Sequence, residues 1–329
     1  MNGRSVVRVT SRSFGETTPR AFAVLEEAGH SVVGEPRGPF YGERLIAELY
    51  GARAAIVGTD GLDAAVLGRL PDLCVIVKHG IGIDNIDLDA ARNANITVAN
   101  VKGSNANAVA EYVVGAMLMT VRRLAAAQAS LGRGEWRRFI GRELGGLTIG
   151  LLGFGRTGRA VAARLSGFGP RLLAFDPFVP PDDAARAGAT LATFDGVLRE
   201  SDVVSLHLPL EAATRHLLDA AVLARMKRGA ILINAARGGL VDAEALAESL
   251  DSGHLAGAAI DVYDHEPPPN DHPLLGREDV VCTPHVAAYT VDALDATSLI
   301  AANHVVDILA GRACEDALTG PFDRHDGTS

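Results

Sequence analysis

Short runs of β-branched residues alternate with Ala- and Leu-rich stretches of helical period along almost the whole chain. Such alternation joins each strand to the next by a helix, which builds parallel sheets with right-handed crossovers and helices on both faces. The pattern therefore predicts an α/β fold. The expected strands are Val6–Thr10, Ala54–Val57, Cys74–Val77, Thr97–Ala99, Thr148–Leu152, Leu172–Phe175, Val203–Leu206, Ile231–Asn234, Ala258–Asp261 and Val280–Cys282. The expected helices are Pro19–Ala28, Asn105–Ala127, Gly158–Gly167, Ala243–Ser252 and Val291–Leu309.

The length of 329 residues fits two domains, at roughly 100–200 residues each. Two strand–helix series are visible, one before about Lys102 and one from about Thr148. The Asn105–Ala127 helix pattern stands between them, followed by a Gly- and Arg-rich stretch from Gly132 to Gly146. The pattern alone leaves open which series the last helix, Val291–Leu309, joins.

The composition excludes several classes of protein. A hydrophobic share of 48 % argues against disorder, and a formal net charge of −9 argues against nucleic acid or an anionic membrane surface as the main partner. The longest apolar stretch, Val113 to Val121, is far shorter than the ~20 residues that span a bilayer, and Met1–Arg8 has no signal-peptide core. We therefore expect a cytoplasmic protein. Because the net charge is negative, an anionic small molecule would have to be bound by positively charged or N–H groups at the site itself.

The three cysteines, Cys74, Cys282 and Cys314, are widely spaced and odd in number. They form no disulfide framework and no zinc pattern, which agrees with a reducing compartment. Cys282 and His285 have the side chains of metal ligands, but no second pair completes a tetrahedral site. We expect no metal.

A glycine-rich loop is the strongest local motif. Gly153, Gly155 and Gly158 follow the expected strand Thr148–Leu152 and open a helical stretch. In a dinucleotide-binding loop the first glycine permits the tight turn, the second lets a pyrophosphate approach the backbone, and the third lets helix and strand pack closely. The helix N-terminus then offers N–H groups and a positive dipole end to the phosphates.

Asp176 closes the next expected strand, at the distance expected for a carboxylate that accepts the ribose hydroxyls of the adenosine. No Arg or Lys follows in Pro177–Val179, so a 2′-phosphate would face this carboxylate uncompensated. The loop and Asp176 together favour NAD over NADP.

Arg237, Glu266 and His285 lie in loops after three later strands, on the edge where open α/β sheets place ligands. Two glycines after Arg237 are expected to let the backbone turn sharply and present the guanidinium to a flat anion. The three side chains could act together as an anion clamp, a carboxylate that orients and charges an imidazole, and an acid/base. Each alone is more often a surface or structural residue.

In combination with the glycine loop, these residues make the sequence resemble the D-isomer-specific 2-hydroxyacid dehydrogenases, and most of all the short D-3-phosphoglycerate dehydrogenases. The resemblance runs from about Leu45 to Leu309. The segments that carry it are Lys78–Asp87, Asn100–Asn105, Ala110-Glu111, Gly153–Gly158, Asn234–Asp242, Asp261–Pro267 and Thr283-Pro284-His285.

The resemblance implies two doubly wound parallel-sheet domains with the active site in a cleft between them. A flavodoxin-like substrate-binding domain would comprise residues 1–103 and 292–329, with the last helix returning to it. A Rossmann NAD-binding domain would comprise residues 104–291. The expected dimer contact involves the Asn105–Ala127 helix of the coenzyme domain.

The resemblance also assigns roles to matching positions. Arg237 would hold the carboxylate and carbonyl oxygen of a 2-oxo acid, and His285, charged through its pairing with Glu266, would protonate that oxygen as hydride arrives. Further residues are expected to contact the cofactor: Gly153, Gly155, Arg156, Thr157, Gly158, Asp176, Pro209, Ala235, Asp261, which would face the nicotinamide carboxamide, and Ser104. Those expected to contact the substrate are Lys78, the backbone N–H groups of His79, Gly80 and Ile81, and Arg237.

Two features limit the identification of the substrate. Phosphoglycerate dehydrogenases often carry Arg-Ser after the strand that matches Ala54–Val57, whereas this chain has Gly58-Thr59. Lys78 can still pair with phosphate as a point charge, and Arg12 either compensates or is an unrelated surface residue. Arg137 and Arg138, beside the sole Trp136, either approach a neighbouring subunit or form a solvated loop.

The expected function is therefore that of an NAD-dependent D-2-hydroxyacid dehydrogenase, a homodimer that acts on a small anionic acid. The expected order of substrates is 3-phosphoglycerate, then hydroxypyruvate or glyoxylate, then other short 2-oxo acids. One alternative belongs to another class: some proteins of this fold are dinucleotide-sensing corepressors that retain the Arg, Glu and His.

Overall fold

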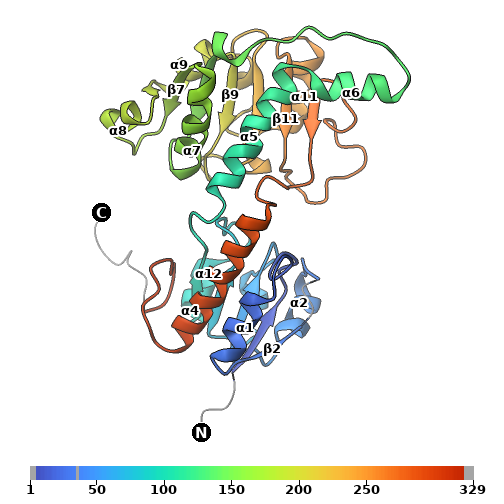
Figure 1. The fold of residues 1–329 in the computed structure, drawn as a ribbon. Helices are drawn as coiled ribbons and strands as arrows, with labels where there is room; N and C mark the ends of the chain where they lie inside the picture. Colours follow the sequence, from blue (N-terminus) through green and yellow to red (C-terminus); the bar gives the residue numbers. More distant parts are fainter. Residues whose placement is uncertain (1–4, 35–36, 322–329) are drawn as a thin grey trace. The chain divides into compact units, whose positions relative to one another are not determined.

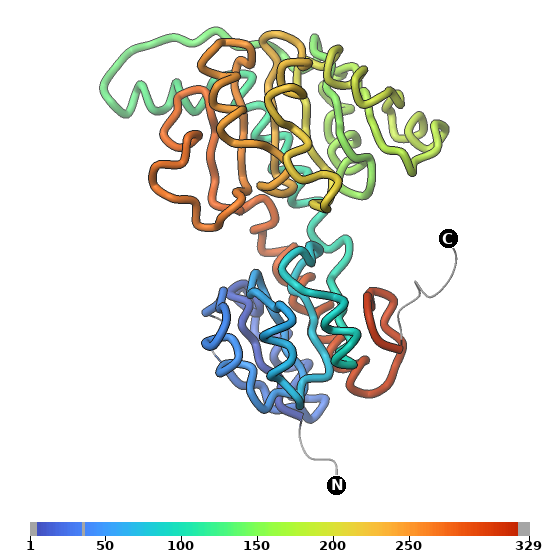
Figure 2. The backbone as a smooth tube through the Cα atoms, turned by 180° about the vertical axis from the view of Figure 1, so that it is seen from behind, coloured from blue at the N-terminus to red at the C-terminus, as the bar shows by residue number. Residues whose placement is uncertain are grey.

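The structure is a computed structural model, and it describes residues 5–34 and 37–321. The chain forms two compact units. Unit 1 comprises Met1–Asn105 and Tyr289–Ser329, and unit 2 comprises Ala106–Ala288. The backbone passes between them twice, as the tube in Figure 2 shows, so unit 2 is an insertion into unit 1.

Unit 1 is built on a parallel sheet in the order β2-β1-β3-β4-β5. The strand order reverses beside β1, which places the topological switch point of this flavodoxin-like sheet between β1 and β3. The loops at the carboxyl ends of these two strands are therefore where ligands are expected. The strands are β1 (Val6–Val9), β2 (Ser31–Val33), β3 (Ala54–Val57), β4 (Val75–Lys78) and β5 (Thr97–Ala99).

Helices cover both faces of this sheet (Figure 1). The helix α1 (Arg20–Glu27) packs against α12 (Val291–Leu309) on one face, where Leu25 and Val305 are fully buried. The other face is covered by α2 (Gly42–Leu49), α3 (Ala64–Leu67) and α4 (Leu88–Asn93). The last helix thus belongs to unit 1, which settles the question that its sequence pattern left open.

Unit 2 contains a seven-stranded parallel sheet in the order β12-β11-β10-β9-β6-β7-β8. The order reverses at β6, which places the switch point of this Rossmann sheet between β6 and β9. The strands are β6 (Thr148–Leu152), β7 (Arg171–Phe175), β8 (Thr190–Leu191), β9 (Val203–Leu206), β10 (Ile231–Asn234), β11 (Gly257–Ile260) and β12 (Val280–Cys282).

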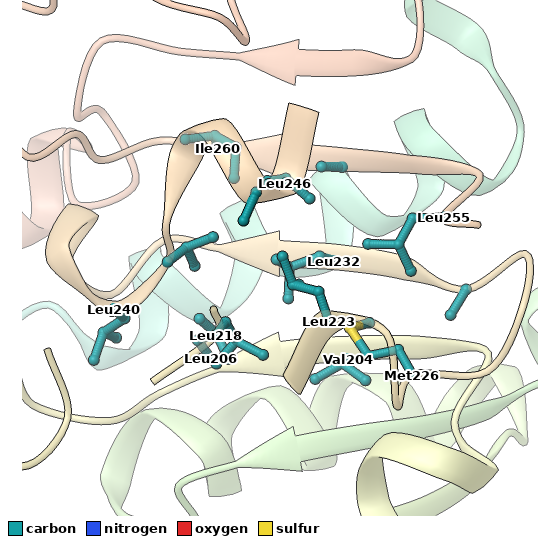
Figure 3. Packing of buried hydrophobic residues seen from close by; sticks show 14 of the residues in the cluster. Val204, Leu206, Leu218, Leu223, Met226, Leu232, Leu240, Leu246, Leu255 and Ile260 are labelled. Atoms are coloured by element: carbon teal, nitrogen blue, oxygen red, sulfur yellow. The ribbon is translucent and has the colours of Figure 1, made fainter. Parts of the chain in front are cut away.

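Each face of the seven-stranded sheet has its own apolar core. One core lies under α5 (Ala106–Val121), α7 (Arg156–Leu165) and α8 (Pro181–Arg186). The other lies under α9 (Phe194–Glu200), α10 (Ala220–Leu223) and α11 (Ala243–Asp251), where Leu232, Leu246 and Ile260 pack together (Figure 3). Strands buried on both faces explain why their sequences are continuous apolar runs.

The α/β prediction is confirmed, and its errors have physical causes. The strand β8 was missed because two residues are too short to show a period, and the three-residue edge strand β2 was missed as well. The predicted helix Asn105–Ala127 is wrong as a single helix: Arg123 has a left-handed φ of 55°, which ends α5 and starts α6 (Leu124–Gly132). Within the described residues, no helix is long and apolar enough to span a membrane.

Candidate active site

The predicted cofactor and catalytic residues of unit 2 all follow the carboxyl ends of its parallel strands. The glycine loop follows β6, Asp176 follows β7 and Pro209 follows β9. Ala235 and Arg237 follow β10, Asp261 and Glu266 follow β11, and His285 follows β12. Because parallel strands end at one edge of a sheet, the topology alone gathers these residues along that edge.

The three glycines of the loop have different roles. Gly153 has a φ of 95°, and a Cβ there would lie 2.6 Å from the carbonyl oxygen of His207. A Cβ on Gly158 would lie 2.4 Å from the carbonyl oxygen of Gly153, so this residue must be glycine for α7 to pack. A Cβ on Gly155 would meet nothing within 4 Å, which is the open space that a ligand needs at this point.

The N-terminus of α7 fits a pyrophosphate. Gly155 is its N-cap and supplies no capping side chain, while Arg156 and Thr157 form the first turn. The first N–H groups of the helix and its positive dipole end therefore face outward without a side-chain acceptor. The residues present thus fit a dinucleotide.

Asp176 is tied to the same loop. One carboxylate oxygen accepts a hydrogen bond from the backbone N–H of Phe154 at 2.8 Å, and the other accepts from that of Phe178 at 2.9 Å. A carboxylate oxygen accepts more than one hydrogen bond, so both keep capacity for a ribose hydroxyl. These two bonds fix the orientation of the carboxylate beside the glycine loop.

Glu266 and His285 form the central pair. Glu266 Oε2 lies 2.7 Å from His285 Nδ1, and Glu266 Oε1 accepts a hydrogen bond from the backbone N–H of Tyr263 at 3.1 Å. Burial would raise the pKa of Glu266, but the bond from His285, the bond from Tyr263 and the charge of Arg237 lower it below its usual value. Glu266 is therefore a carboxylate, and His285 keeps Nε2 for other contacts.

Arg237 is positioned by its own loop. The buried side chain of Asn234 bonds the Arg237 carbonyl and the Ala236 N–H, and an Arg237 Nη1–H donates to the Ala236 carbonyl at 2.6 Å. The two following glycines lie in a 3-10 turn, Gly238–Leu240, and neither has a positive φ. A Cβ on Gly238 would lie 2.0 Å from the Tyr263 carbonyl carbon, so glycine here lets the Arg237 loop approach the Glu266 loop.

His285 itself sits in the left-handed region, with a φ of 54°. Its N–H donates to the Asp261 carbonyl, and the fully buried Asp261 carboxylate accepts from the hydroxyl of Thr283 and the N–H groups of Val286 and Ala287. These contacts hold a conformation that is unfavourable for a residue with a Cβ. Asp261 thereby fixes the loop that presents the imidazole.

Sequence reasoning missed the residues that support this loop. Tyr112 of α5 contacts the Thr283 hydroxyl at 2.6 Å, and the Tyr263 hydroxyl donates to the Thr283 carbonyl at 3.1 Å. Burial, together with neighbouring groups such as Asp261, raises the pKa of Tyr112 to about 12, so it is protonated at neutral pH. Tyr112 lies far from Thr283 in the chain, and no local pattern marks it.

The remaining predicted cofactor residues have ordinary environments. The exposed Pro209 offers its carbonyl to the Thr214 hydroxyl, and Ala235 is half-buried at the end of β10. Ser104 belongs to unit 1, where its hydroxyl lies 2.7 Å from that of Thr297 in α12.

The predicted substrate segment follows β4 in unit 1. The Lys78 side chain donates to the Gly58 carbonyl and, at 3.0 Å, to Asn85 Oδ1. The His79 N–H donates to Val57 and the Gly80 N–H to Lys78. Of the three backbone N–H groups expected to receive a carboxylate, only that of Ile81 has no partner among the described residues. The expected carboxylate contact therefore narrows to the Ile81 N–H.

The His79 ring is a structural bridge in unit 1. Nδ1 lies 3.0 Å from the Ser13 hydroxyl and Nε2 lies 2.9 Å from the Ser298 hydroxyl. Burial and the charge of Lys78 lower its pKa to about 4, so the ring is neutral at pH 7. Over residues 5–34 and 37–321, no group of His, Cys, Asp or Glu could hold a metal ion.

Unit 2 therefore has the fold of a dinucleotide-binding domain, with the His285–Glu266 pair at the same sheet edge as the glycine loop. The family model "D-isomer specific 2-hydroxyacid dehydrogenase, NAD binding domain" matches residues 114–287. The chain belongs to the D-isomer-specific 2-hydroxyacid dehydrogenase family, and unit 2 is its NAD-binding domain.

Three relatives illustrate the range of the family. The chain is 41 % identical over 278 residues to the D-3-phosphoglycerate dehydrogenase of Mycobacterium leprae, covering 84 % of this chain and 52 % of the relative. It is 43 % identical over 277 residues to the (S)-sulfolactate dehydrogenase of Chromohalobacter salexigens, covering 82 % and 89 %. The crystal structure of the TT0316 protein of Thermus thermophilus aligns with a TM-score of 0.86 and 36 % identity, covering 95 % and 100 %. The chain thus spans about half the length of the phosphoglycerate dehydrogenases it matches.

Proposed function

We propose that the protein is an NAD-dependent D-2-hydroxyacid dehydrogenase that interconverts a 2-hydroxy acid and its 2-oxo acid. The observation that carries the proposal is the His285–Glu266 pair, at 2.7 Å, with Arg237 close enough to lower the pKa of Glu266, on the same sheet edge as the glycine loop. An imidazole that is hydrogen-bonded to a carboxylate is suited to deliver and recover a proton.

The cofactor, when bound, supplies or accepts the hydride. Gly153, Gly155, Gly158 and Asp176 would hold it, with Arg156, Thr157, Pro209, Ala235, Asp261 and Ser104 as further proposed contacts. The Asp176 carboxylate, with no cation in Pro177–Val179, favours NAD over NADP.

The proton and the substrate are handled by side chains of the chain itself. In the reducing direction, Arg237 would bind the substrate carboxylate and carbonyl oxygen with its planar fork. His285 Nε2 would give its proton to the carbonyl oxygen, while Nδ1–H stays bonded to Glu266. In the oxidising direction His285 would take that proton back, and Glu266 stabilises the resulting imidazolium.

We propose that unit 1, residues 1–103 and 292–329 by the sequence boundaries, is the substrate-binding domain. Its proposed contacts are Lys78 and the His79–Ile81 backbone, of which the Ile81 N–H is the open donor in the described chain. The preferred substrate is 3-phosphoglycerate, as in the relative from Mycobacterium leprae, followed by hydroxypyruvate or glyoxylate. Sulfolactate is a second candidate because the relative from Chromohalobacter salexigens, matched over 89 % of its length, acts on it.

We further propose a cytoplasmic homodimer. Support for the dimer comes from large apolar side chains exposed on and after α6, namely Leu131, Trp136 and Ile140, the last 93 % exposed. The net charge of −9 argues against nucleic acid as a partner, which disfavours the corepressor alternative.

The test is a panel of D-2-hydroxy acids with NAD and of 2-oxo acids with NADH, followed by nicotinamide absorbance, with NADP and NADPH as the matched cofactor control. We expect turnover of at least one acid with NAD and weaker turnover with NADP. Tight dinucleotide binding without turnover of any acid would overturn the enzyme assignment and favour the sensor.

A further inference from the structure

A cationic cavity lies in unit 1, outside the residues of the candidate active site. It has a volume of about 660 Å³ and is lined by Arg12, Arg37, Pro39, Phe40, Tyr41 and Arg44. Three of the six lining side chains are arginines and none is acidic, in a chain whose net charge is −9. A volume of this size is typical of small-molecule sites.

A buried aspartate builds the walls of the cavity. Asp60 is fully buried and accepts hydrogen bonds from the Thr10 hydroxyl at 2.7 Å, the Phe40 N–H at 2.8 Å and the Gly58 N–H at 2.9 Å. It therefore joins the loops that follow β1, β2 and β3, at the switch point of the sheet. Gly38 is needed here, because a Cβ would lie 2.7 Å from both Asp60 Oδ1 and the Thr10 carbonyl oxygen.

The charges of Arg12 and Arg44 lack compensation inside the cavity. Arg12 donates to the Arg37 carbonyl at 3.4 Å, and the Arg44 guanidinium lies 4.6 Å above the Phe40 ring. In the described chain, neither Arg12 nor Arg44 has a carboxylate within 4 Å. A guanidinium that is held in place without a carboxylate partner is suited to bind an oxyanion.

The N-terminus of α2 lies at the same cavity. Tyr41 is its N-cap and makes no side-chain capping bond, and Arg44 lies in its first turn. The first N–H groups of this helix and its positive dipole end thus add to the arginine charges.

The cavity shares a sheet edge with the proposed carboxylate contacts. Ser13, next to Arg12, contacts His79, and the Lys78 side chain donates to Gly58, so the loops after β1, β3 and β4 are linked directly. These strands lie in the order β1-β3-β4 with a spacing of about 4.8 Å, so the ends of β1 and β4 are about 10 Å apart. If the carboxylate of a short acid binds the Ile81 N–H, the other end of the acid would point toward the arginines of the cavity.

We propose that this cavity is the subsite for a second acidic group, a phosphate, sulfonate or carboxylate, at the distal end of the substrate. The proposal rests on the proposed dehydrogenase function. It adds which residues determine the substrate specificity of the enzyme. Arg12 and Arg44 carry the recognition in place of the Arg-Ser pair, where this chain has Gly58-Thr59.

The test compares two 2-oxo acids that differ only by the phosphate, 3-phosphohydroxypyruvate and hydroxypyruvate, each with NADH, and adds sulfopyruvate as a sulfonate. The variants are Arg12→Gln and Arg44→Gln. Arg53→Gln is the matched control, since Arg53 is exposed and precedes β3 at the opposite edge of the sheet. Hydrogen bonds to charged groups contribute about 1.5–3 kcal/mol, so each variant should lower the ratio of kcat/KM for an acid with the distal group to that for hydroxypyruvate by about tenfold or more. The control should keep the wild-type ratio.

The outcomes separate the two proposals. Absence of turnover with every acid in the wild type contradicts the proposed function. Turnover with an unchanged ratio in both arginine variants contradicts only the subsite. Inorganic phosphate is the further probe: competition against 3-phosphohydroxypyruvate that both variants weaken supports the subsite. If phosphate instead changes the kcat for hydroxypyruvate, and both arginine variants abolish this change, the cavity is an effector site. That result would overturn its assignment as a substrate subsite.

Discussion

The two units use the same device at the carboxyl edge of their sheets and present different chemistry with it. In each, a fully buried aspartate accepts one hydroxyl and two backbone N–H groups and so ties neighbouring loops together: Asp60 in unit 1 and Asp261 in unit 2. Asp60 holds the wall of a cationic cavity, whereas Asp261 holds a titratable imidazole. The buried carboxylate thus supports each site, and the side chains that its loops present, arginines in unit 1 and His285 in unit 2, decide the chemistry of that site.

The two strand-end histidines show the same contrast. His79 lies between two hydroxyls, which bond a neutral ring, and its pKa is lowered to about 4. His285 instead places Nδ1 2.7 Å from Oε2 of the Glu266 carboxylate. The partner of a histidine that follows a parallel strand therefore decides whether the ring has a structural role or a role in proton transfer. The position of the histidine in the sequence does not reveal that partner.

The largest expected effect comes from His285→Ala. A positioned acid/base contributes about 10²–10⁴ in rate, so kcat should fall by that factor while NADH binding, measured by fluorescence titration, stays within about twofold. His254→Ala, beyond α11 and away from the carboxyl edge, is the control and should retain wild-type kcat. A variant at His285 that keeps most of its turnover would show that another group moves the proton.

Replacing each buried aspartate by asparagine should separate the two scaffolds. An amide puts N–H donors against N–H donors, which leaves at least one group unsatisfied and costs about 1–3 kcal/mol of folding free energy in either unit. Asp261→Asn should also lower kcat for every acid by about tenfold or more, because the His285 loop loses its anchor. Asp60→Asn should instead raise KM selectively for acids with a distal anionic group.

Urea unfolding and steady-state kinetics on both variants check this prediction. If Asp60→Asn lowered kcat for hydroxypyruvate as much as Asp261→Asn does, the two sites would not have the separate roles that their contacts indicate.

The sequence predicted what local rules determine. Continuous apolar runs located the strands of both sheets except β2 and β8, and the glycine spacing located a loop in which Gly153 and Gly158 have no room for a Cβ. What it could not predict depends on contacts between distant segments. Nothing near Gly238 indicates the Tyr263 backbone that excludes a Cβ, and nothing near Thr283 indicates Tyr112. The arginine cavity likewise arises only once Asp60 draws three loops together.

The smallest expected effect is a pH dependence of stability from His79. Burial, with the charge of Lys78, lowers the folded-state pKa to about 4, whereas the unfolded value is about 6.5. Between these values the unfolded chain takes up a proton that the folded chain does not, so stability falls as pH falls. From pH 7 to pH 5.5 the loss from this residue is about 1 kcal/mol.

His79→Gln tests this contribution directly, because a glutamine amide offers a donor and an acceptor to Ser13 and Ser298 but does not titrate. The change in urea midpoint between pH 7 and pH 5.5 should be smaller in the variant by the equivalent of about 1 kcal/mol. His207, whose pKa is also lowered to about 4 by desolvation, remains in both proteins and supplies the same background in unit 2. An equal pH slope in variant and wild type would mean that the His79 ring takes up its proton while folded, and the contrast with His285 would then fail.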